Sequence, residues 1–108
     1  MQVLFQSRHT HVSEAVRTAA AEKLARLERY LHRIERAVVT FAEEPTAIAS
    51  DLETCEVWLH VRGRPLFAKA TAAHQGAALE KVVVKLEQQL ATRKGRLVGR
   101  SHLARKAS

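Results

Sequence analysis

The sequence has few of the features on which several classes of protein depend. Its one cysteine, Cys55, excludes an intramolecular disulfide and any zinc site built on paired cysteines, so packing alone must hold the fold together. No apolar run approaches the roughly 18 residues that a membrane-spanning helix needs. The first residues also lack the basic segment and the long apolar stretch of a signal peptide. We therefore expect a cytoplasmic protein.

Patterns that mark catalytic or phosphate-binding sites are also scarce. The four glycines lie too far apart to form a phosphate-binding loop, and the six histidines include no HExxH pair. Glu43 and Glu44, with Asp51 and Glu53, resemble the carboxylate set of a metal-dependent nuclease, but adjacent acids in a loop are usually only solvated charge. We expect no enzyme activity, no metal or other cofactor, and no small-molecule substrate.

What the chain does have is an excess of positive charge. Lys and Arg number 18 against 11 Asp and Glu, a formal net charge of +7. Five of the 11 acids lie in residues 37–61, a segment without Lys or Arg, so all 18 basic residues stand elsewhere against six acids. This balance predicts an anionic partner, with nucleic acid favoured over an acidic membrane surface.

Hydrophobic periodicity predicts six elements in the order β-α-β-β-β-α. Strands with period two are expected at 1–8, 37–42, 55–61 and 66–72, and helices from 14 to about 32 and from 75 to about 95. Ser13 suits a helix N-cap, residues 43–51 a loop, and Gly95 a helix end. The order predicts an α+β fold, a four-stranded sheet with two helices packed on one face.

Three residues or runs within these elements need separate interpretation. Cys55 is expected to be a small buried strand residue. The β-branched run Val82–Val84 fits a helix poorly, but the longer helical periodicity outweighs it. Trp58 shares its strand face with Glu56 and His60 in the acidic region, so we expect it to lie on the outer face of the sheet, packed or partly exposed, rather than to stack on bases.

Each predicted helix carries a row of basic side chains on one flank of its apolar stripe. On the second helix Glu80 and Glu87 fall on the opposite flank. If the helices lie side by side, the two basic rows merge into one surface suited to a phosphate backbone, although solvated helix faces also carry such charge for solubility. The rows are Lys81, Lys85, Thr92 and Arg96 on the second helix, and Lys23, Arg26, Arg29 and Arg33 on the first.

The charge at the carboxyl end is of one sign. No acid follows Glu87, whereas six Lys or Arg residues follow Thr92. This end repels a basic partner and is suited to phosphates. We expect a single domain at 1–96 followed by a basic, flexible tail at 97–108.

Several segments match one family in the right order along most of residues 1–96. They are Ser7-Arg8-His9, 12–17 (VSEAVR), 22–30 (EKLARLERY), 68–70 (AKA), 77–81 (AALEK) and 85–90 (KLEQQL). On these residues the chain resembles the ribosome hibernation-promoting and ribosome-associated inhibitor family, in its short form without a dimerisation domain. It departs from that family at 74–77 (HQGA), where members carry an acidic residue and an aromatic.

The resemblance implies a fold like that of double-stranded-RNA-binding domains and a role as a ribosome hibernation factor. Such a factor binds the small ribosomal subunit, its RNA and its proteins, in the messenger and transfer-RNA channel, and inhibits translation under stress or in stationary phase. It implies no membrane partner and a monomer off the ribosome. The RNA-binding positions that it implies are Arg8, Arg17, Lys23, Arg26, Arg29, Lys81, Lys85, Arg93, Lys94 and Arg96.

Two alternatives remain open. A double-stranded-RNA-binding module has the order α-β-β-β-α, which this chain contains, and predicts binding to naked duplex RNA. A protein-interaction module that modulates a transcription regulator would use the acidic sheet edge and Trp58. For the ribosome hypothesis, Lys81 and Lys85 are expected to face solvent, so that reversing both charges abolishes ribosome association and spares the fold.

Overall fold

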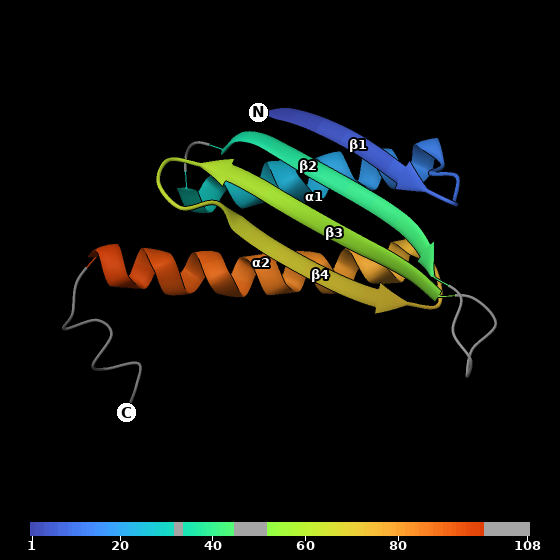
Figure 1. Cartoon of the computed structure of the whole chain (residues 1–108). Helices are drawn as coiled ribbons and strands as arrows, with labels where there is room; N and C mark the ends of the chain where they lie inside the picture. The colour runs from blue at the N-terminus through green and yellow to red at the C-terminus, as the bar shows by residue number, and fades with distance from the viewer. Residues whose placement is uncertain (32–33, 45–51, 99–108) are drawn as a thin grey trace.

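The computed structural model describes residues 1–31, 34–44 and 52–98. They form β1 (Gln2–Arg8), α1 (Glu14–Leu31), β2 (Ile34–Glu44), β3 (Leu52–Val61), β4 (Leu66–Ala72) and α2 (Gln75–Val98). The strands make one sheet in the order β1-β2-β3-β4, and both helices cover the same face of it (Figure 1). The predicted α+β class and element order are confirmed.

Pairing within the sheet follows from the connections between the strands. β1 and β2 are parallel, which requires a crossover, and α1 supplies it. The pairs β2–β3 and β3–β4 are antiparallel. β1 and β4 are therefore the two edge strands, and β2 and β3, which carry most of the acidic segment, are central.

Both helices begin at residues that cap them. Ser13 accepts hydrogen bonds from Val16 N–H through its hydroxyl, at 3.2 Å, and from Arg17 N–H through its carbonyl, at 3.0 Å, as its N-cap role predicts. At α2 the residue in this role is His74. Its Nδ1 accepts from Ala77 N–H at 3.4 Å, and its carbonyl accepts from Ala78 N–H at 3.1 Å.

The core lies between the helices and one face of the sheet. Alternate residues of each strand face the helices, and β4 alternates strictly between buried and exposed positions. Val82 is buried, Val83 half-buried and Val84 exposed, so burial of one face overrides the poor helix propensity of this run. The largest buried side chains include Leu24, Leu27, Phe41, Leu59, Leu79, Leu86 and Leu90.

Several element boundaries differ from those predicted. β2 is longer at both ends, because a bulge at Glu35 lets Ile34 and Ala37 both face the core and because Glu43 and Glu44 pair with β3 instead of forming a loop. β3 begins at Leu52, three residues early. α2 continues to Val98, since a glycine such as Gly95 costs a helix only about 1 kcal/mol relative to alanine.

Cys55 is fully buried on β3, as predicted. Burial, and to a lesser degree the adjacent Glu56 carboxylate, raises the pKa of its thiol to about 12, so the thiol stays protonated and unreactive at neutral pH. We expect iodoacetamide to alkylate Cys55 only as fast as the protein unfolds. As a matched control, Thr18→Cys in a Cys55→Ala background places a thiol on the exposed side of α1 and should react at once. Equally fast labelling of native Cys55 would contradict the closed core.

Candidate nucleic-acid interface

Two of the predicted RNA-binding residues, Lys23 and Arg26, line a groove between α1 and α2. Glu80 and Glu87 of α2 line the same groove. The half-buried Lys23 ammonium lies 3.4 Å from the Glu80 carboxylate. The acidic flank of α2 therefore faces α1, and Lys23 links the two helices as well as contributing positive charge.

The basic flank of α2 faces the other way, over the edge strand β4. Lys81 Nζ donates a hydrogen bond to the Thr71 carbonyl at 3.2 Å, and Lys85 Nζ donates to the Lys69 carbonyl at 2.6 Å. Gln89 Nε2 donates to the Phe67 carbonyl at 2.9 Å. We call Lys81, Lys85 and Gln89 the edge ladder.

The edge ladder has a simple geometric basis. Four residues of helix rise about 6 Å, and two residues of strand rise about 6.6 Å. Donors at every fourth position of α2 therefore meet successive carbonyls on the outer edge of β4. Edge carbonyls are otherwise a template for pairing with another chain, so the ladder also protects this edge.

These contacts change two expectations from the sequence. The basic rows of the two helices do not merge although the helices lie side by side, because Glu80 and Glu87 stand between them. Lys81 and Lys85 are exposed, as expected, but their ammonium groups are engaged by β4. Reversing both charges would remove both hydrogen bonds and set carboxylates near carbonyl oxygens, so we expect this change to lower stability as well as ribosome association.

The other predicted residues of α1 are distributed around the helix. Arg26 and Arg29 are exposed, and neither forms an ion pair with another described residue. Arg17 is also exposed, but at 100° per residue it lies about 120° around the helix from Lys23, on the flank away from α2. The structure does not describe the side chains of Arg93, Lys94 and Arg96, in the last turns of α2. Arg33, the last member of the basic row predicted for the first helix, also lies outside the described residues.

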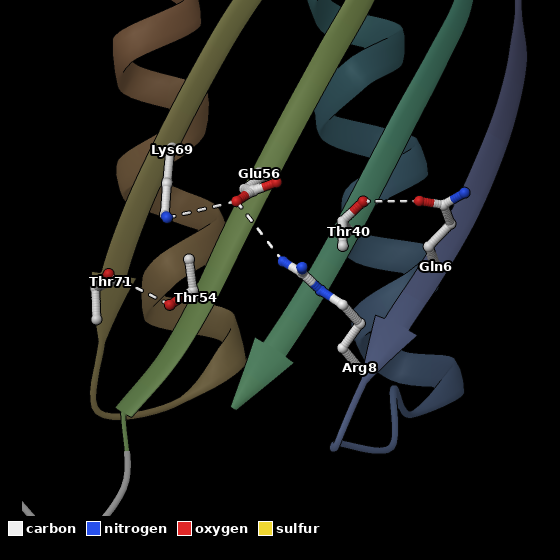
Figure 2. Close-up of polar contacts among 7 residues, drawn as sticks. All are labelled: Gln6, Arg8, Thr40, Thr54, Glu56, Lys69 and Thr71. Carbon is white, nitrogen blue, oxygen red and sulfur yellow. Dashed lines mark hydrogen bonds and ion pairs between the residues drawn. The ribbon is translucent and has the colours of Figure 1, made fainter. Parts of the chain in front are cut away.

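Arg8 lies on the opposite side of the molecule. Figure 2 shows it reaching from β1 across the uncovered face of the sheet toward β3. Its guanidinium lies 3.8 Å from the Glu56 carboxylate, and Lys69 Nζ of β4 lies 3.5 Å from the same oxygen. The predicted basic residues whose side chains are described thus occupy three sides: the outside of α1, the α2–β4 edge and the open sheet face.

The start of α2 contains a polar network that the sequence did not reveal. Gln75 Nε2 donates to Thr10 Oγ1 at 3.0 Å and to the His11 carbonyl at 2.9 Å. Thr10 in turn donates to Glu53 at 3.1 Å. The signal in the sequence was the departure from the family at 74–77, and the structure shows that Gln75 ties this corner to the loop between β1 and α1.

Among the described side chains, the acidic residues form neither a metal centre nor an edge of the sheet. Within the described ranges, no three His, Cys, Asp or Glu side chains gather so that they could hold a metal ion. Glu43 and Glu53 lie opposite each other at one end of the central strands, and Asp51 lies outside the described residues. The prediction of an acidic sheet edge, on which the protein-interaction alternative depended, is thus wrong for the described acids, which lie on central strands.

None of the described helices is long and apolar enough to span a bilayer.

The chain is similar to known proteins over nearly its whole length. Residues 3–98 match the family described as "Sigma 54 modulation protein / S30EA ribosomal protein". The chain is 31% identical over 97 residues to the ribosome hibernation promoting factor of Escherichia coli K12, covering 90% of this chain and 97% of that protein. It is 31% identical over 107 residues to the protein of the same name from Azotobacter vinelandii, covering 99% of this chain and 95% of that protein.

Two solved structures share the fold. A ribosomal subunit interface protein from Coxiella burnetii has a TM-score of 0.77 at 19% identity, covering 87% of this chain and 98% of that one. The N-terminal domain of Thermus thermophilus Protein Y has a TM-score of 0.68 at 25% identity, covering 83% and 96%. This chain therefore shares its arrangement of four strands and two helices with both structures.

The edge ladder should contribute measurably to stability. Lys85→Ala removes the donor to the Lys69 carbonyl and should lower the free energy of unfolding by about 1 kcal/mol in urea denaturation. Lys85→Gln supplies the kind of donor that Gln89 already uses and should recover part of the loss. Gln88→Ala, at an exposed position beside the ladder, is the matched control and should change stability little. Equal stability of the Lys85→Ala and Gln88→Ala variants would show that the contact contributes nothing.

Proposed function

Because the chain belongs to the sigma 54 modulation protein / S30EA ribosomal protein family, we propose that it is a ribosome hibernation factor that binds the small ribosomal subunit. In this proposal it occupies the channel of messenger and transfer RNA and stops translation under stress or in stationary phase. The near-complete match to two proteins named ribosome hibernation promoting factor supports the role. Such a factor acts in the cytoplasm.

The observation that carries this proposal is the placement of cations on three sides of one rigid domain. Arg26 and Arg29 are exposed on α1, Lys81 and Lys85 follow the α2–β4 edge, and Arg8 stands on the open face. A protein enclosed in an RNA channel meets phosphates on several sides at once. A module that binds one duplex needs a single basic face, so this distribution favours the channel over naked duplex RNA.

The proposed action is steric. The helices and sheet form a wedge whose basic side chains contact ribosomal-RNA phosphates, and the wedge excludes messenger and transfer RNA from their positions. No covalent bond forms or breaks, so the action requires no catalytic group and no cofactor. We assign it to the domain at 1–96, acting as a monomer, with the basic segment at 97–108 adding phosphate contacts.

The proposed contacts are the ten basic positions of the family match. Arg17, Lys23, Arg26 and Arg29 act from α1, and Lys81 and Lys85 from the α2–β4 edge, where β4 already orients their ammonium groups. Arg93, Lys94 and Arg96 continue along α2, and Arg8 contacts RNA from the opposite side.

Ribosome binding should depend on salt and on the assembled subunit. Sedimentation of the protein with purified small subunits, large subunits and naked duplex RNA at a series of salt concentrations measures both. We expect binding to small subunits, with affinity falling by about 0.7 to 0.9 log units per log unit of salt for each phosphate engaged. Equal affinity for naked duplex RNA would favour the duplex-binding alternative, and binding to none of the three would contradict the ribosome hypothesis and favour the protein-interaction alternative.

Neutralising the exposed arginines of α1 should weaken this binding without unfolding the protein. For Arg26→Gln with Arg29→Gln we expect weaker binding to the small subunit and a salt slope lower by about 1.4 to 1.8, because two phosphate contacts are lost. The matched variant, Arg26→Lys with Arg29→Lys, keeps both charges and should keep most of the slope. An unchanged affinity and slope in a normally folded glutamine variant would show that these residues do not contact RNA.

A further inference from the structure

The face of the sheet that the helices leave uncovered carries a continuous apolar row. In register across β1, β2, β3 and β4, Leu4 lies beside Val38, Val38 beside Trp58, and Trp58 beside Phe67. Leu4 is 38% exposed, Trp58 42% and Phe67 37%. Soluble monomers seldom leave such a contiguous apolar patch to solvent unless it binds something. We call these four residues the open-face row.

The polar groups beside this row are already engaged within the face. Figure 2 shows Thr40 donating to Gln6, at 3.2 Å, and Thr54 against Thr71, at 3.4 Å. Glu56 lies between Arg8 and Lys69. The open-face row differs from these polar groups: no described residue covers it, and its largest side chains remain partly exposed.

At one end of the row stands an aromatic pair. The Trp58 and Phe67 rings have centroids 4.5 Å apart and are tilted by 42°. The pair is held on two antiparallel neighbours of a rigid sheet, so its orientation does not depend on a loop. Exposed aromatic rings on such a surface are suited to stacking against a flat partner, and every nucleobase provides one.

The charge around the row is positive, contrary to the acidic surroundings expected for Trp58 from the sequence. Glu56 is offset by two cations, and the hairpin that joins β3 to β4 follows Trp58 and precedes Phe67, at the aromatic end of the row. Including that hairpin and the bulge in β2, five cationic residues surround the row against two acidic ones. The residues are Arg8, Arg36, Arg62, Arg64 and Lys69 against Glu35 and Glu56.

We propose that the open face is a second RNA-binding site, at which an unpaired nucleotide of single-stranded RNA stacks its base on the Trp58–Phe67 pair. Lys69 on one side of the pair and Arg36 on the other are placed to contact the adjoining phosphates. The site lies on the side of the sheet opposite α1 and α2, so it can be occupied while the helices contact other RNA. It is independent of the proposed ribosome function.

Trp58 is the only tryptophan in the chain, so its fluorescence reports on this site directly. A short oligoadenylate titrated into the native protein should quench that fluorescence, with a dissociation constant that rises with salt. An oligomer of the same length made of abasic ribose phosphates carries the same charge without bases and should quench far less. Equal quenching by both oligomers, or none by either, would overturn the proposal.

Two substitutions separate stacking from general apolar contact. Phe67→Tyr keeps the ring and should bind oligoadenylate as the native chain does. Phe67→Leu keeps apolar bulk without a ring and should raise the dissociation constant roughly 5- to 150-fold, the range expected for one lost stacked base. If Phe67→Leu binds oligoadenylate as tightly as Phe67→Tyr, no base stacks on the Phe67 ring and the proposal is wrong.

The helix side provides the remaining control. The Arg26→Gln, Arg29→Gln variant retains the open-face row and should show undiminished quenching by oligoadenylate. Loss of quenching in that variant would place the oligomer on α1 and contradict the open-face site. Failure of the ribosome hypothesis appears in a different assay, as the absence of sedimentation with small subunits.

Discussion

The packing of α1 and α2 onto one face of the sheet decides which surfaces this protein has left for binding. Leu24 and Leu27 from α1, and Val82 and Leu86 from α2, are buried in the core between the helices and the sheet. Because both helices cover the same face, no described helix covers the opposite face, on which the open-face row lies. Because α2 lies along β4, its lysines meet the carbonyls of that edge, and its acidic flank turns toward α1.

This arrangement gives a strongly basic chain an uneven surface. The five acids of residues 37–61 do not build an acidic face from the side chains described: Glu56 is held between two cations, and Glu53 accepts a hydrogen bond from Thr10. The exposed cations point outward from three sides of a rigid body. Such a surface fits a partner that surrounds the protein better than one that meets a single face, and this is why the proposed function is the filling of an RNA channel.

The sequence predicted what depends on local pattern. Element order, the strand at 66–72, the Ser13 cap and the burial of Cys55 each follow from periodicity or residue chemistry within a few positions. It failed where the answer depends on a distant partner. The length of β2 is set by pairing with β3, and the hydrogen bonds of Lys81 and Lys85 by carbonyls that only the fold brings near. A helical wheel places a basic row on a helix but does not say which neighbour that row faces, and this is why the merged basic surface was wrong.

The central claim is that the helix side of this domain lies against RNA of the small ribosomal subunit, and directed hydroxyl-radical cleavage tests it most directly. An iron chelate tethered to Thr18→Cys in a Cys55→Ala background stands on the exposed side of α1, on the same flank as Arg29 and about three turns before it. With the protein bound to whole ribosomes, the account predicts strand breaks in small-subunit RNA, near the messenger channel, that disappear when salt releases the protein. Breaks confined to large-subunit RNA, or none above the level of the chain without cysteine, would contradict it.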